Sequence, residues 1–179
     1  MSAPSVDRRP IHENLERARS SLQTLVSQAT RADLRRPSAG TRWTNRQLLF
    51  HMLFGYLIVQ RLLSLVRAFG HLPEGVDRRF AQALNVGTRP FHAVNYLGSC
   101  GGALVFHDHR LTVGMDRVIA SLHRRLDGET DEALETCMHF PVRWDPFFRD
   151  QMSLADVYRF GTEHFDFHAT QLTLGRPRS

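Results

Sequence analysis

A chain of 179 residues is long enough to bury one hydrophobic core, and we expect residues 1–179 to form a single domain with short flexible termini. Its 42% hydrophobic and 23% charged residues are ordinary for a globular protein, and the longest apolar stretch, at 48–59, is too short for a membrane span. The net charge of +5 comes from 23 arginines and no lysine, scattered singly or in pairs, so we expect neither a nucleic-acid partner nor lysine-based catalysis.

The N-terminal residues and the number of cysteines both indicate the cellular compartment of the protein. The first ten residues lack the apolar segment of a secretory signal. Cys100 and Cys137 show no metal-binding or redox spacing and are too few for a disulfide framework. We therefore expect a cytoplasmic protein without a membrane anchor, in which both thiols stay reduced.

Two amphipathic helices are expected in the first 70 residues, since apolar residues recur there every three or four positions. Thr44 and Gln47 form a capping box that begins the second helix. The inward positions of the first helix are Ile11, Leu15, Ala18, Leu22, Leu25, Val26 and Ala29. Those of the second are Leu48, His51, Gly55, Ile58, Leu62 and Val66.

Residues 70–102 show little periodicity and contain two prolines and six glycines. A connection this long is unusual in a compact domain unless it has a function or local structure of its own. The segment GSCGG at 98–102 is interpreted as a flexible hinge before the next helix. We therefore expect a long loop or insertion between the second and third helices.

A third helix is expected from about Leu104 to Leu126, and it carries one anomaly. Its inward stripe would be Leu104, Asp108, Leu111, Met115, Val118, Leu122 and Leu126. Asp108 falls on that stripe, and a buried carboxylate needs a partner. The alternative is a helix that begins one turn later, with Asp108 near its cap.

The last helix is expected to begin at Ser153, which forms a capping box with Asp156. It follows the aromatic stretch 139–148, which two prolines make an ordered loop rather than a helix. Its inward positions are Leu154, Val157, Gly161, His164, Phe165, His168 and Leu172. With no strong strand signal, four long amphipathic helices predict an all-α four-helix bundle.

Three of the inward residues are histidines. His164 and His168 lie four positions apart, so both imidazoles project from one face of a helix. His51 points inward from another helix of the bundle, and three protein ligands with one open position make a catalytic zinc site. Gly55 and Gly161, one turn from these histidines, indicate either space for a metal or substrate, or close helix packing. The spacing therefore predicts a metal site between the second and fourth helices.

Two short motifs extend this interpretation. The segment WTNRQLLFH, from Trp43 to His51, and the segment HFDFHATQL, from His164, resemble the metal-binding elements of the DinB-like superfamily of four-helix-bundle proteins. The resemblance implies that His51, His164 and His168 bind a divalent ion, most often zinc or nickel. It also implies a homodimer.

The resemblance further implies a small-molecule substrate and a thiol-dependent S-transferase or isomerase that uses a low-molecular-weight thiol such as mycothiol or bacillithiol. Asp108 is the first candidate for its acid or base, or for the acceptor that orients a ligand imidazole. Two alternatives remain. One is a non-enzymatic, metal-stabilised bundle that serves as a stress-response interaction module. The other is a phosphohydrolase of the HD type, built on His107 and Asp108.

Overall fold

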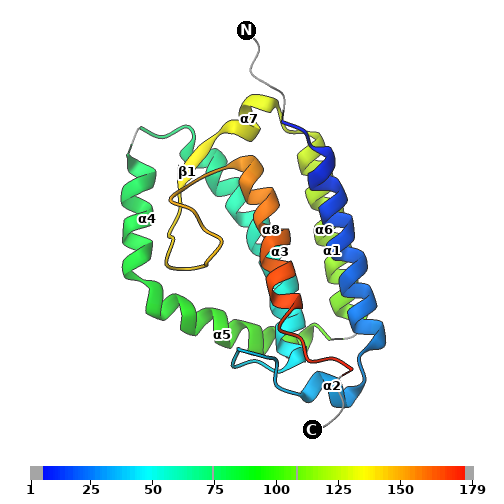
Figure 1. Cartoon of the computed structure of the whole chain (residues 1–179). Helices are drawn as coiled ribbons and strands as arrows, with labels where there is room; N and C mark the ends of the chain where they lie inside the picture. Colours follow the sequence, from blue (N-terminus) through cyan, green and yellow to red (C-terminus); the bar gives the residue numbers. More distant parts are fainter. Residues whose placement is uncertain (1–5, 74, 108, 176–179) are drawn as a thin grey trace.

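The computed structural model describes residues 6–73, 75–107 and 109–175, and helices dominate them (Figure 1). Four long helices form a bundle: α1 (Arg9–Gln28), α3 (Asn45–Phe69), α6 (His109–Asp127) and α8 (Leu154–Ala169). Around the bundle α1 contacts α6, α6 contacts α3, α3 contacts α8, and α8 contacts α1. The predicted all-α four-helix bundle is confirmed.

The starts of α3 and α8 are where the capping boxes predict them. The Thr44 side chain accepts a hydrogen bond from the Gln47 backbone N–H, and the Gln47 side chain accepts one from the Thr44 N–H. Ser153 and Asp156 make the same reciprocal pair at the start of α8. Each box satisfies backbone donors that the first helical turn leaves without partners.

The excursion between α3 and α6 is explained by the direction of the helices. In Figure 1, α1 and α8 run downward, whereas α3 and α6 run upward, so the chain that leaves α3 must return to the lower end. Two helices make this return, α4 (Val76–Val86) at the side and α5 (Thr88–Val105) along the bottom. The insertion predicted between the second and third long helices is therefore present, but it is mostly helical rather than a loop.

The interpretation of GSCGG as a hinge is wrong, because these residues lie inside α5. Gly102 allows α5 to approach α3, since a Cβ at this position would lie 2.1 Å from the ring of Phe50. The expected start of the third long helix at Leu104 is also wrong. Leu104 belongs to α5 and is 75% exposed, and α6 begins at His109. Asp108 lies outside the described residues.

Four short elements complete the fold: α2 (Arg31–Arg35), α7 (Asp131–Glu135), β1 (Cys137–His139) and β2 (Gln151–Ser153). The two strands pair antiparallel, with Cys137 opposite Ser153, and so bring together the ends of the aromatic loop. Three residues are too few to show the alternation typical of a strand, so neither strand is predicted from the sequence. The predicted ordered loop before α8 is present.

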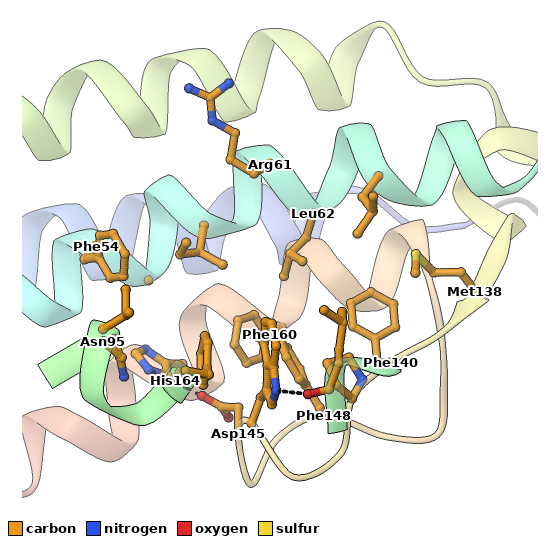
Figure 2. A pocket seen from close by; sticks show the side chains of 18 of the residues that line it. Phe54, Arg61, Leu62, Asn95, Met138, Phe140, Asp145, Phe148, Phe160 and His164 are labelled. Atoms are coloured by element: carbon orange, nitrogen blue, oxygen red, sulfur yellow. Dashed lines mark hydrogen bonds and ion pairs between the residues drawn. The ribbon is translucent and has the colours of Figure 1, made fainter. Parts of the chain in front are cut away.

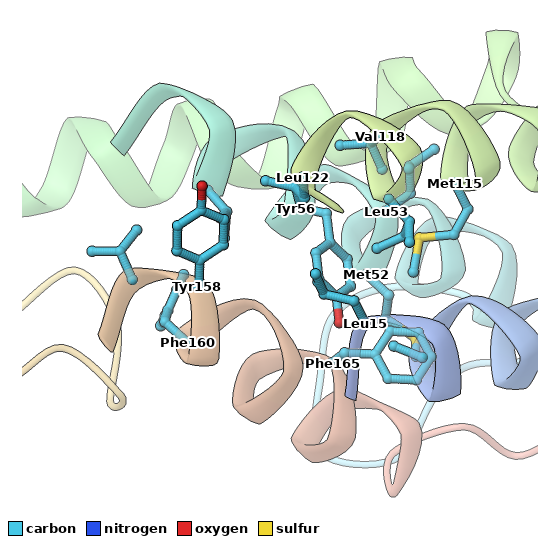
Figure 3. Close-up of a cluster of buried hydrophobic side chains, with 14 of the residues drawn as sticks. Leu15, Met52, Leu53, Tyr56, Met115, Val118, Leu122, Tyr158, Phe160 and Phe165 are labelled. Atoms are coloured by element: carbon cyan, nitrogen blue, oxygen red, sulfur yellow. The ribbon is translucent and has the colours of Figure 1, made fainter. Parts of the chain in front are cut away.

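The core lies between the four long helices, and α3 is its central member (Figure 3). By length and composition α3 could also cross a membrane, with a mean hydropathy of 1.6, but 56% of that window is buried inside the fold. Burial on this scale explains why the helix is apolar nearly all round. Cys100 and Cys137 are free thiols, as expected.

Close packing of α8 on α3 depends on Gly161. A Cβ there would lie 2.8 Å from the ring of Tyr56 and 3.1 Å from Val59. We expect Gly161→Ala to lower the free energy of unfolding by about 1–3 kcal/mol, because the extra methyl overpacks a buried contact.

Gly101 offers the matched control for Gly161. A Cβ at Gly101 would meet no atom within 4 Å, so Gly101→Ala should raise the free energy of unfolding by about 0.5–1 kcal/mol through helix propensity. Urea denaturation of both variants checks the two signs. Equal effects at both positions would contradict the packing argument.

Candidate metal centre

Three histidines from two helices converge in the bundle. His51 projects from α3, and His164 and His168 project from α8. One nitrogen from each ring lies within 4.8 Å of the other two, and the ring centroids are 4.5–5.0 Å apart. All three side chains are buried. The structure thus brings together the three residues that the sequence pattern grouped, and their group can hold a metal ion.

Hydrogen bonds fix the tautomers of two of the rings. The Ser99 hydroxyl donates to the carbonyl oxygen of Asn95 at 2.8 Å, so at the 3.1 Å contact with His51 it accepts a hydrogen bond from Nδ1–H. The Nδ1–H of His168 donates to the side-chain oxygen of Gln171 at 2.7 Å. Both rings therefore carry their proton on Nδ1 and keep the lone pair of Nε2 free for a ligand.

One ring nitrogen of His164 has no hydrogen-bond partner in the part of the chain that the structure describes. Its Nδ1 is buried and makes no hydrogen bond among the described residues, which is costly unless something else binds it. This nitrogen faces α3 at Gly55, where a Cβ would lie 2.8 Å from it. On the other side of the ring, Nε2 lies 3.6 Å from Oδ2 of Asp145. A proton held on Nε2 beside this carboxylate leaves the lone pair on Nδ1.

The environment keeps all three imidazoles neutral. Burial lowers the pKa of His51 to about 3, with a smaller contribution from His168. Burial also lowers the pKa of His164, and the two neighbouring histidines add to this effect. For His168 burial lowers the pKa, although its hydrogen bond to Gln171 acts in the opposite direction. Neutral imidazole is the form that binds metals.

Each of the two motifs that carry the family resemblance contains a residue that contacts one of these imidazole rings. Trp43 stacks on His51, with ring centroids 4.3 Å apart. Gln171, three residues after His168, fixes the tautomer of that histidine. The roles of Trp43 and Gln171 are thus to orient two of the histidines, as expected for residues around a metal site.

Two contributors to the site are absent from the sequence-based prediction. Asp145 belongs to the aromatic loop between β1 and β2, and burial raises the pKa of its carboxyl group. It is the single acidic residue in the aromatic stretch 139–148, and this is the feature of the sequence that could have indicated a role in the site. Ser99 lies in the segment that was interpreted as a hinge, so nothing in the sequence pointed to it.

Asp108, the predicted acid or base, lies outside the described residues. The histidine before it does not support the phosphohydrolase alternative, because His107 is exposed and is not a member of the histidine group. Among the described residues, Asp145 is the carboxylate that contacts this group, through His164.

A cavity of about 380 Å³ opens beside two of these histidines (Figure 2). Its walls come from α3, α4, α5, α8 and the aromatic loop, and His51 and His164 form part of its lining. The volume falls in the range of sites for small molecules, about 300–1,000 Å³. A ligand in the cavity would therefore contact the histidine group directly.

The donor set fits a divalent metal with an open position. Three neutral imidazoles supply three nitrogen ligands, and Nδ1 of His164 has no other partner among the described residues. Zinc and nickel both accept imidazole nitrogen, and an open coordination position is the mark of a catalytic site.

Comparison with known proteins agrees with this geometry. The chain matches the family model of the DinB superfamily over residues 14–172. This span includes all three histidines and the four long helices, apart from the first turn of α1. No curated protein and no solved structure matched it in the parallel searches. With a match over nearly its whole length, the chain belongs to the DinB superfamily.

Proposed function

We propose that the protein is a metal-dependent enzyme that joins a low-molecular-weight thiol to an electrophilic carbon of a small molecule bound in the cavity. The observation that carries this proposal is the position of the histidine group beside the cavity, which two of its members, His51 and His164, help to line. A purely structural ion would need no such access, since structural zinc sites are closed.

The metal would be held by His51 and His168 through Nε2 and by His164 through Nδ1. When bound, zinc or nickel would supply Lewis acidity, which lowers the pKa of a thiol that coordinates it. Ser99 and Gln171 keep two of the imidazoles in the required tautomer. The apolar walls exclude water, which strengthens every electrostatic interaction in the site.

We assign the proton transfer of this reaction to Asp145, whose Oδ2 lies 3.6 Å from Nε2 of His164 and which lines the cavity. In a transfer, the thiol sulfur forms a bond to the electrophilic carbon, the bond from that carbon to its leaving group breaks, and the thiol proton passes to the leaving group through Oδ2 of Asp145. In an isomerisation, the thiol adds to a double bond and leaves again after rotation about the new single bond. In both reactions the apolar cavity would hold the electrophilic molecule.

The test is an assay of thiol consumption by protein loaded with zinc or nickel. Mycothiol, bacillithiol and glutathione are each offered with a panel of activated alkenes and alkyl halides, and the remaining thiol is titrated. We expect turnover with at least one pair, and a fall of roughly 100-fold or more in Asp145→Asn protein that still holds its metal. A loaded protein that consumes no thiol from any pair would refute the transfer but leave the metal site in place; an isomerisation regenerates the thiol and is followed by the change in the alkene instead.

A further inference from the structure

The cavity beside the histidine group is long, because it follows one face of α3. Its lining residues on this helix begin at His51, recur at helical spacing and end at Leu65. A rise of about 1.5 Å per residue places the two ends of this face about 21 Å apart. Figure 2 shows the same extension, with Asn95 and His164 toward one end and Met138 at the other.

The cavity is also narrow. Divided by a length of about 21 Å, its volume of about 380 Å³ gives a mean cross-section of about 18 Å². Carbon atoms that are not bonded to each other approach to about 3.5–4.0 Å. A cross-section of this size therefore admits one chain of carbon atoms and leaves no room for a second chain beside it.

The end of the cavity remote from the histidines is closed by buried side chains. Met138 of β1 and Phe140 of the aromatic loop line this end, and each is 1% exposed. Phe80 of α4 lines it as well, and its ring contacts that of Phe69 at the end of α3, with centroids 4.9 Å apart. A ligand chain that enters beside the histidines therefore has a limited length in which to extend.

The α4–α5 segment and the aromatic loop complete the wall between the two ends. Trp144 of the loop stacks on Phe91 of α5, with ring centroids 3.9 Å apart and planes at 10°. The indole N–H of Trp144 donates to the carbonyl oxygen of Leu84 in α4 at 2.8 Å. All three residues line the cavity. The helices that return the chain to α6 thus help to enclose the long space beside α3.

Polar groups gather at one end of the cavity. Figure 2 shows Asn95, Asp145 and His164 close together, whereas the end at Met138 is apolar. Arg61 also lines the cavity, but its side chain is exposed and points away from the other labelled side chains. A divalent ion held by the histidines would add a positive charge at the polar end. A ligand with one polar or anionic head and one apolar tail matches this distribution.

We infer that the substrate of this site carries an extended, unbranched aliphatic chain, which lies along α3 from the histidine group to Met138 and Phe140. With C–C bonds of about 1.5 Å, an extended chain advances about 1.3 Å per carbon, so the cavity holds up to about 16 carbons. The reactive carbon would be in the head group, beside His51 and His164. The inference rests on the proposed function for the statement that this head reacts, whereas binding of the chain does not depend on it.

A series of saturated, unbranched carboxylic acids of 6 to 18 carbons tests the chain length. The head group is constant, so differences in Kd between members report the chain, whatever the carboxylate does at the metal. In isothermal titration calorimetry with metal-loaded protein, we expect Kd to fall about threefold for each added carbon up to about 14 carbons and then to level off. A Kd that does not depend on chain length, or that still falls at 18 carbons, would overturn the inference.

A pair of isomeric skeletons tests the shape of the cavity. Undecanoic acid and 1-adamantanecarboxylic acid have the same number of carbons and the same head group, but one is a thread and the other a compact cage. We expect the linear acid to bind about tenfold or more tighter, because the cage is too wide for the cavity. Equal affinities, or tighter binding of the cage, would overturn the inference.

A variant at the remote end locates the bound chain. Leu65 is partly buried and lines the cavity four helical turns from His51, so Leu65→Trp should shorten the space. The Kd should then level off at about 10 carbons, while the six- and eight-carbon acids bind as they do to wild type. Leu104→Trp is the matched control, because Leu104 lies on the exposed face of α5, outside the cavity lining. A shorter limit in Leu104→Trp but not in Leu65→Trp would place the chain outside the cavity and overturn the inference.

The outcome separates the chain preference from the proposed activity. Binding of these acids needs no thiol and no turnover, so a confirmed chain length beside a failed assay of thiol chemistry would refute the proposed activity alone. Turnover of compact electrophiles, together with a Kd that does not depend on chain length, would overturn the chain inference and leave the activity in place.

Discussion

Protein that carries His164→Ala is expected to hold less than roughly a tenth of the divalent metal that wild-type protein holds, about one ion per chain. The ring of His164 lies 4.5–5.0 Å from the other two rings of the group, and its Nδ1 has no hydrogen-bond partner among the described residues. Two remaining imidazoles cannot complete a three-ligand site. Elemental analysis of untagged protein, purified without chelator and dialysed against zinc or nickel, measures the ratio.

His123→Ala is the control for this measurement. His123 lies on α6, where it contacts His12 and Glu16 and has no place in the histidine group. Its removal should leave the metal content unchanged. Wild-type protein that binds no ion after zinc or nickel is offered would make the three histidines ordinary core residues, and equal loss in both variants would point to general misfolding.

Removal of the metal separates a catalytic ion from one that only stabilises the bundle. An ion that binds the folded state alone adds about 4 kcal/mol to the free energy of unfolding at a thousandfold excess over its Kd. A chelator should therefore lower the melting temperature of wild-type protein but not of His164→Ala. If the metal-free bundle stays folded at room temperature, the ion is not what holds the helices together.

Much of the fold could be predicted because the long helices are amphipathic and capping boxes mark where two of them begin. Leu111, Met115 and Leu122 are buried as their spacing predicts. The capping boxes at Thr44 and Ser153 begin helices within one residue of the prediction. Metal binding by the three histidines stays a prediction. Their convergence could be predicted because each histidine lies on the inward face of its helix, and the hydrophobic period of the sequence identifies that face.

The α4–α5 segment escaped prediction for a physical reason. One face of α5 packs on α3 at Ser99 and Ala103, and the opposite face is apolar as well, with Val94, Leu97 and Leu104 exposed. A helix that is apolar on both faces has no amphipathic period to detect, and its glycines resemble those of a loop. Homodimerisation, which the family resemblance implies, stays a prediction.

Asp145 could not be assigned to the site from sequence, since its place depends on tertiary structure. It approaches His164 because β1 and β2 close the aromatic loop and Trp144 ties that loop to α4. None of these contacts is local in sequence. A site built from helix faces can thus be predicted in part, whereas the loop residues that complete it cannot.

Metal-free protein is expected to lose about 2 kcal/mol of unfolding free energy through His51 alone when the pH falls from 7 to 5. Burial lowers the pKa of His51 to about 3 in the folded protein, while in the unfolded chain it stays near 6.5. Below pH 6.5 the unfolded chain therefore binds a proton that the folded protein excludes. The loss begins at that pH and grows until the pH reaches the folded pKa, about 3.

Urea denaturation of metal-free wild type and His51→Asn at both pH values measures this loss. Asparagine does not titrate in this range and can still donate to Ser99, so His51→Asn should show a smaller fall in stability than wild type by about 2 kcal/mol. His164 and His168 add losses of the same sign, because burial lowers the pKa of both rings. An identical pH dependence in the two proteins would show that His51 is already protonated, or exposed to water, when the metal is absent. In that case the histidines would become neutral only when the ion binds, and the fold of the metal-free protein would not keep them neutral.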